Sequence, residues 1–150
     1  MFATITVAAL QRVLDVNLVG PLLGMQAAIP AMRARGGGAI VNVASNATPL
    51  IFAQACSYAP SKSALAALTK TAAVHCAQKG YGIRINSIHP GPHETRMMLD
   101  GGVDGTADAI PMKRMGRLSE AAAAVAFLTC DDASYITASE LFIDGGMTAT

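Results

Sequence analysis

The sequence predicts an α/β fold in which a parallel sheet is covered by helices on both faces. Two patterns along the 150 residues predict it. Helical stretches alternate with short β-rich runs, an order that gives right-handed crossovers between parallel strands. The β-rich runs are also apolar almost throughout, as strands buried on both faces usually are. Only three such runs can be counted, so we expect the sheet to be cut short.

The first helical stretch covers residues 8–35, and three glycines at 36–38 end it. The run "AIVNVA" at residues 39–44 predicts the first strand. With only three strands, this run would lie at an open, apolar edge of the sheet, which proteins normally avoid.

The stretch "CSYAPSK" places Tyr58 and Lys62 four residues apart, on either side of Pro60. Proline is tolerated in the first turn of a helix, because the first backbone N–H groups have no intrahelical partner. We therefore expect a helix over residues 57–78 with Ser57 as its N-cap. In that helix the phenol and the ammonium share one face.

The remaining elements follow in the same alternation. The run "IRINSI" at residues 83–88 predicts the second strand, and "ELFI" at 140–143 predicts the third. Residues 89–118 are rich in Pro, Gly and Met and predict a long irregular segment. A helix should then open at Ser119 and Glu120 and continue through "AAAAVAFL".

The glycine-rich turn of nucleotide-binding sheets is missing from this pattern. Such a turn joins a strand to a helix and is followed by an acidic residue. Here "RGGGAI" precedes its strand, and "DGGVDG" lies inside the irregular segment. We therefore expect that this chain lacks a phosphate-binding opening.

The composition bears on the classes of partner that this chain could bind. The chain is 52% hydrophobic and 14% charged, against a usual charged share of about 25%. This predicts helices buried on more than one side or a large subunit interface. A net charge of +1 gives no reason to expect binding to nucleic acid or an anionic membrane. The apolar stretch at residues 16–32 contains two prolines and two glycines, so we do not expect a membrane span.

The start "MFATITVAAL" has no basic segment or cleavage pattern, and we expect no signal peptide. The three cysteines are odd in number and widely spaced, which is typical of reduced thiols. Both features predict a cytoplasmic protein.

Six motifs in order make the chain resemble the short-chain dehydrogenase/reductase family, similar to its hydroxysteroid and secondary-alcohol dehydrogenases. They are "DVNLVG", "IVNVAS", "YAPSK", "RINSIHPG", the threonine of "HETRM", and "YITASELFIDGG". The resemblance implies a Rossmann-like doubly wound parallel sheet. Residues 1–150 would form a single domain, the C-terminal three strands with flanking helices, without the dinucleotide-binding half.

The resemblance implies roles for four catalytic residues. Tyr58 would be the general acid/base, and the charge of Lys62 would help it release a proton nearer neutrality. Lys62 would also bind the nicotinamide ribose. Ser45 would hold the substrate oxygen, and Asn17 would support a water in a proton relay. The alternatives are an ordinary helix-surface pair, a serine that caps a turn, and an asparagine at a helix irregularity.

The resemblance also implies that the segment with Pro90, Gly91, His93 and Thr95 wraps the carboxamide end of nicotinamide. Tyr58 and Lys62 would bind the cofactor as well. His93 stands where the family usually has Val or Ile. Another departure is Ala138, where glycine is commoner and where we expect a small structural effect.

A metal site is not expected, because Pro-Gly-Pro separates His89 from His93 and Glu94 and no further ligand aligns with them. Four methionines lie in or beside the segment that closes over the substrate in the family. These residues could form an adaptable apolar pocket, or they could simply pack a loop. They are Met97, Met98, Met112 and Met115.

Two functions follow as alternatives. The first is an NAD- or NADP-dependent oxidoreductase that acts on a small secondary alcohol or ketone. The second is an inactive truncated chain that serves only as an oligomerisation or binding module. The family usually pairs subunits through the helices matched by residues 8–35 and 57–78, so we expect a homodimer or homotetramer in either case.

Overall fold

The computed structural model describes residues 2–50, 53, 55–100 and 106–149. Its centre is a sheet of three parallel strands, β1 (Gly38–Val43), β2 (Ile83–Pro90) and β3 (Glu140–Ile143), in the order β1-β2-β3. The predicted α/β class and all three predicted strands are therefore confirmed. β2 was expected to end at Ile88 but continues for two more residues, to Pro90.

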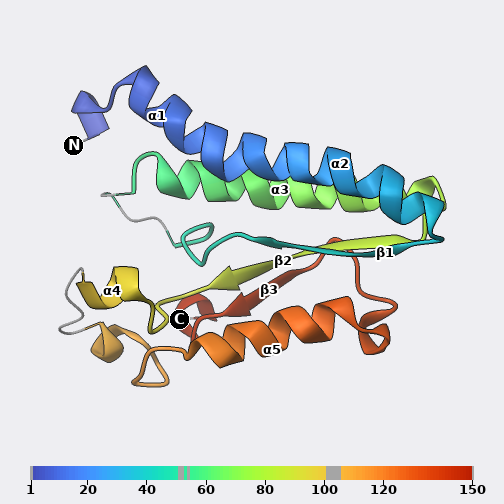
Figure 1. The fold of residues 1–150 in the computed structure, drawn as a ribbon. Helices are drawn as coiled ribbons and strands as arrows, with labels where there is room; N and C mark the ends of the chain where they lie inside the picture. The colour runs from blue at the N-terminus through green and yellow to red at the C-terminus, as the bar shows by residue number, and fades with distance from the viewer. Residues whose placement is uncertain (1, 51–52, 54, 101–105, 150) are drawn as a thin grey trace.

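Helices cover both faces of this sheet (Figure 1). α1 (Val7–Leu14), a π-helical turn at Asp15–Val19 and α2 (Gly20–Ala34) form one continuous helix. It lies beside α3 (Tyr58–Gln78) on one face, and α5 (Leu118–Thr129) packs on the other. The result is a three-layer arrangement, as expected for a doubly wound sheet.

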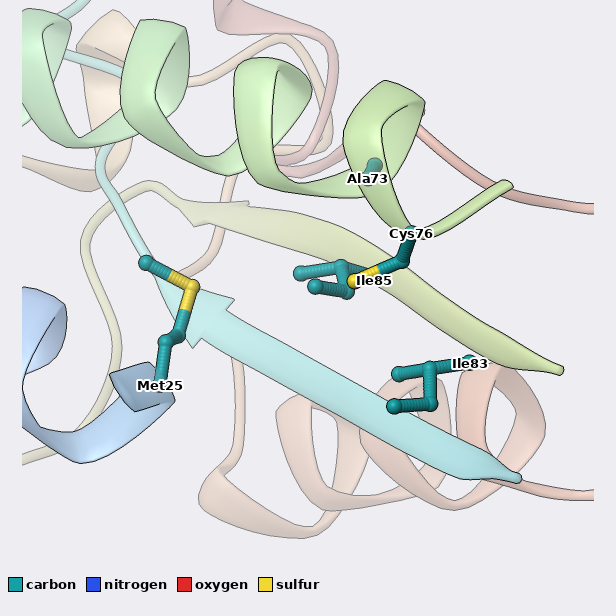
Figure 2. Close-up of a cluster of buried hydrophobic side chains, with 5 residues drawn as sticks. All are labelled: Met25, Ala73, Cys76, Ile83 and Ile85. Atoms are coloured by element: carbon teal, nitrogen blue, oxygen red, sulfur yellow. The ribbon is translucent and has the colours of Figure 1, made fainter. Parts of the chain in front are cut away.

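The core between α2, α3 and the sheet is a small apolar cluster (Figure 2). Ala73 and Cys76 of α3 lie above Ile83 and Ile85 of β2, and Met25 of α2 approaches from the side. All five side chains are buried. This cluster packs the C-terminal half of α3 against the sheet.

The two glycine stretches that flank β1 and β2 meet at the start of the sheet. Gly37 has φ +139°, and a Cβ there would lie 2.3 Å from the carbonyl oxygen of Gly82. Gly38 begins β1 and donates its N–H to that same oxygen. Glycine is therefore needed for a close backbone crossing as well as for the end of the helix.

Three predicted details differ in the structure. Ser57 is the N-cap residue of α3, as predicted, but its backbone is helical and its side chain makes no capping hydrogen bond. α5 begins at Leu118, and Glu120 accepts the N–H of Arg117 instead of opening the helix itself. The segment at 89–118 contains a short helix, α4 (Arg96–Asp100).

β1 forms the open edge of the sheet, as the sequence predicted. β1 pairs only with β2 among the described strands, and the side chain of Val43 is 51% exposed. On length and composition, the described part of the chain has one helix that could cross a membrane, Val7–Ala34. That helix packs on α3, and its Met25 belongs to the core.

Candidate active site

A cleft lies at the carboxyl ends of the parallel strands, where open α/β sheets usually bind ligands. Its volume is about 630 Å³. The loops after β1 and β2, the first turn of α3 and one side of α5 form its walls. Seven of the eight predicted site residues line it: Ser45, Tyr58, Lys62, Pro90, Gly91, His93 and Thr95.

Tyr58 and Lys62 share one face of α3, as predicted. The helix begins at Tyr58, so Pro60 falls in its first turn. The Nζ atom of Lys62 lies 5.8 Å from the centre of the Tyr58 ring and donates a hydrogen bond of 2.8 Å to the carbonyl oxygen of Val43. Burial lowers the pKa of Lys62 from its ordinary value. A cation is therefore held close to a half-exposed phenol at the mouth of the cleft.

Ser45 is buried just beyond the end of β1. Its Oγ accepts the backbone N–H of Ala47 at 3.1 Å. The hydroxyl proton is then free for another acceptor, because a serine oxygen accepts and donates at once. The turn geometry that we gave as the plain alternative is thus present, and it leaves the hydroxyl able to donate.

Asn17 is the one predicted residue that does not line the cleft. It lies in the π-helical turn between α1 and α2, so the helix irregularity given as its plain alternative is real. Its Nδ2 donates to Ser61 Oγ at 3.0 Å, and Ser61 Oγ donates to the carbonyl oxygen of Tyr58 at 2.7 Å. Asn17 therefore reaches the first turn of α3 through Ser61.

The segment from Pro90 to Thr95 is tied to all neighbouring elements. Asn46 donates its N–H to the carbonyl oxygen of Pro90, and Gly91 donates to that of Ile143 at the end of β3. Thr95 Oγ1 accepts the N–H of Met98 and begins α4. Hydrogen bonds thus join this backbone to the loop after β1 and to the end of β3, and residues of the segment line the cleft.

His93, the departure noted in the sequence, is 5% exposed. Its Nδ1 lies 2.9 Å from the carbonyl oxygen of Gly91, so this nitrogen carries the proton. Nε2 is buried and has no hydrogen-bond partner among the described residues. Gly116 covers it so closely that a Cβ at that position would lie 2.6 Å from Nε2.

The four methionines divide between the two expectations. Met98 lines the cleft, whereas Met112 lines a smaller hollow of about 280 Å³ and is 60% exposed. Met115 is half-buried, and the side chain of Met97 lies outside the described part. Within the described residues, no group of three or more His, Cys, Asp or Glu could hold a metal ion.

Sequence reasoning missed the apolar wall of the cleft. One side of α5 supplies it, with a further contribution from Met147 near the C-terminus. The signal was present, because the α5 residues have the i, i+3, i+4, i+7 spacing of a single helix face. They are Leu118, Ala121, Ala122 and Val125.

Comparison with known proteins shows which proteins this chain is similar to. A model of the family described as "Enoyl-(Acyl carrier protein) reductase" matches residues 1–148. Cyclohexanol dehydrogenase of Acinetobacter sp. (strain SE19) is 41% identical over 139 residues, which cover 93% of this chain and 55% of that protein. 3beta-Hydroxysteroid dehydrogenase 1 of Eggerthella lenta is 40% identical over 144 residues, 92% of this chain and 54% of that one.

Among solved structures, a variant of ElxO with NADPH bound has a TM-score of 0.90 and 28% sequence identity. The alignment covers 99% of this chain and 61% of that one. The chain therefore spans little more than half the length of the relatives it matches.

Proposed function

Because the chain belongs to the short-chain dehydrogenase/reductase family, we propose that it carries the nicotinamide end of an oxidoreductase active site. The reaction would be hydride transfer between NAD or NADP and a secondary alcohol or ketone. The observation that carries the proposal is the cleft itself. Ser45, Tyr58 and Lys62, which come from two separate segments, line it together.

Each of these residues has a distinct part in the proposed reaction. The Tyr58 hydroxyl exchanges a proton with the substrate oxygen, as a general acid/base must be placed to do. The Ser45 hydroxyl donates to that oxygen and orients it. The Lys62 ammonium, one turn along α3, stabilises the negative charge that develops on the phenol oxygen. Asn17 acts on this turn through Ser61.

The residues present fit the nicotinamide end of the cofactor. Dehydrogenases of the family use NAD or NADP, and the bound cofactor supplies or accepts the hydride. The N–H groups of Gly91, Glu94 and Thr95 already bond to other backbone carbonyls. A carboxamide would therefore bond to carbonyl oxygens of this segment, which can each accept a second hydrogen bond. Lys62 offers a donor for a ribose hydroxyl. The side chain of His93 points toward Gly116, so its departure from Val or Ile leaves the backbone contact possible.

The substrate should be a small, mostly apolar alcohol. The wall formed by α5 and Met147 has no charged side chain, which favours a hydrocarbon body beside the reacting oxygen. Two relatives are named for cyclohexanol and for a 3β-hydroxysteroid. Cyclic secondary alcohols are therefore the first substrates to test.

The test is turnover of cyclohexanol with NAD⁺ or NADP⁺, followed by nicotinamide absorbance. Tyr58→Phe should lower kcat by about 10²–10⁴-fold, the usual contribution of a general acid/base. Tyr135→Phe is the matched control, because Tyr135 is fully exposed and does not line the cleft. Equal rates for wild type and Tyr58→Phe would contradict the proposed role.

A second candidate function is supported by one feature of the surface. Large apolar side chains are exposed along the helical layer, namely Val7, Val16, Leu23 and Val74. We propose that this layer pairs two copies of the chain, in the cytoplasm and whether or not the chain is active. Light scattering should show a dimer of the wild-type protein and a monomer of Leu23→Asp. If neither protein shows any turnover, this result would favour the assembly module over the enzyme.

A further inference from the structure

A buried histidine behind the cleft is bonded to the backbone of Ser45. His89 lies near the end of β2 and is 0% exposed. Its Nδ1 lies 3.0 Å from the carbonyl oxygen of Ser45 and 2.9 Å from Thr48 Oγ1. Its Nε2 lies 2.9 Å from Ser87 Oγ. Both ring nitrogens are therefore used, although the residue itself does not line the cleft.

The partners decide which nitrogen carries the proton. A carbonyl oxygen only accepts, so the hydrogen bond to Ser45 forms in the tautomer that carries the hydrogen on Nδ1. Burial lowers the pKa of His89 from its ordinary value of 6.5, and the ring is then neutral at pH 7. Nε2 of the neutral ring is an acceptor, and the Ser87 hydroxyl donates to it. The bond to Ser45 and the bond from Ser87 therefore occur in the same tautomer.

The carbonyl oxygen of Ser45 is held by three donors. Besides the contact with His89, it accepts hydrogen bonds from the Thr48 hydroxyl at 2.9 Å and from the N–H of Thr48 at 3.2 Å. The side chain of Ser45 is fixed separately, by the N–H of Ala47 on its Oγ. The bond from His89 is the only one of these four that comes from outside the turn at residues 45–48.

We propose that His89 is a positioning residue, which anchors the backbone of Ser45 to β2 and so aims the serine hydroxyl into the cleft. The proposal rests on the proposed role of Ser45. The neighbours of Ser45 are already paired with β2, because Ala44 donates its N–H to Ile88 and Asn46 donates to Pro90. The carbonyl oxygen of Ser45 itself has a link to β2 only through a side chain, among the described contacts. His89 supplies that link across 44 residues of sequence.

Two substitutions separate positioning from packing. His89→Asn keeps an N–H near the place of Nδ1, whereas His89→Gln keeps a polar group only near the place of Nε2. Both remove the ring that packs on Phe142, 4.6 Å away between centroids. Loss of aromatic packing is therefore common to the two variants, and only the bond to Ser45 differs.

The readout is amide hydrogen exchange at Ala47 and Thr48, with Ala73 in the core as the reference. His89→Gln should speed exchange at the two turn amides about tenfold, the equivalent of one hydrogen bond. His89→Asn should stay close to wild type at these amides. If both variants leave the turn unchanged, or both speed Ala47, Thr48 and Ala73 equally, the proposal is overturned.

A measurement on the wild-type protein covers the case in which a variant does not fold. Nitrogen chemical shifts of His89 should show a proton on Nδ1, and a proton on Nε2 alone would overturn the proposal. Neither measurement requires turnover, so an inactive chain would refute the proposed function and leave the positioning role standing. In an active chain, His89→Gln should lower kcat more than it changes KM, and His89→Asn should restore it.

Discussion

Lys62 reaches from α3 to the carbonyl oxygen of Val43 and forms a hydrogen bond of 2.8 Å with the last residue of β1. The N–H of the next residue, Ala44, bonds to Ile88 of β2. Because successive residues of a strand face opposite sides, the Val43 carbonyl faces the open edge. The Lys62 ammonium, which we propose for the active site, therefore also forms a hydrogen bond with the open edge of the sheet at β1.

Replacing Lys62 by Met should leave the free energy of unfolding unchanged or raise it by up to about 1 kcal/mol. The lowered pKa of Lys62 indicates that burial disfavours its charge, and the exposed carbonyl can bond to water instead. Urea unfolding measures the change, with Lys79→Met at an exposed position as the control. A loss of more than about 1 kcal/mol would assign Lys62 a mainly structural role.

Replacing Ala138 by Gly should stabilise the protein by about 1 kcal/mol. Ala138 has φ +59°, in the left-handed region that favours glycine, and its N–H is bonded to Ile85. Urea unfolding again measures the change. Ala72→Gly in the middle of α3 is the matched control and should destabilise by a similar amount. If Ala138→Gly also destabilises, the methyl packing at this position outweighs its backbone strain.

Replacing Gly116 by Ala should destabilise the protein by about 1–3 kcal/mol, because the new Cβ would overlap Nε2 of His93. The imidazole cannot move away easily, since its Nδ1 is held by Gly91. His93→Val should remove the overlap, so the double variant should recover most of the loss. A double-mutant cycle with additive effects would contradict this close contact.

Acidification should lower stability through His89. Burial lowers the pKa of His89 from 6.5 in the folded state, so the unfolded state binds more protons below that pH. Stability therefore falls as the pH drops through 6.5 toward the lower folded value, and it is regained above 6.5. The test is to measure the free energy of unfolding across this pH range in wild type and in His89→Asn, and to compare how steeply it changes with pH. An equal slope in both proteins would contradict the assignment to His89.

Local signals in the sequence predicted much of the fold. Glu140–Ile143 was expected and found with the same bounds, because a short apolar run between turn residues is self-contained. α3 was predicted within one residue at its start from Pro60, because proline is tolerated in the first turn of a helix. That start in turn placed Tyr58 and Lys62 on one face.

The features that could not be predicted join residues far apart in the sequence. The contact from Asn17 to Ser61 and the contact from His89 to Ser45 each span 44 residues. The spacing of small residues in α5 showed one apolar face, but only the packing shows that this face meets the cleft. The predicted catalytic and cofactor roles themselves stay predictions.

Calorimetric titration of the 150-residue protein with NADH and with NADPH tests the central claim most directly. We predict saturable binding of at least one of them. Lys62→Met should weaken it by at least about tenfold, the effect of one lost hydrogen bond to a charged group, whereas Lys79→Met should not. A folded protein that binds neither dinucleotide would contradict the claim that this cleft holds the nicotinamide end of a cofactor.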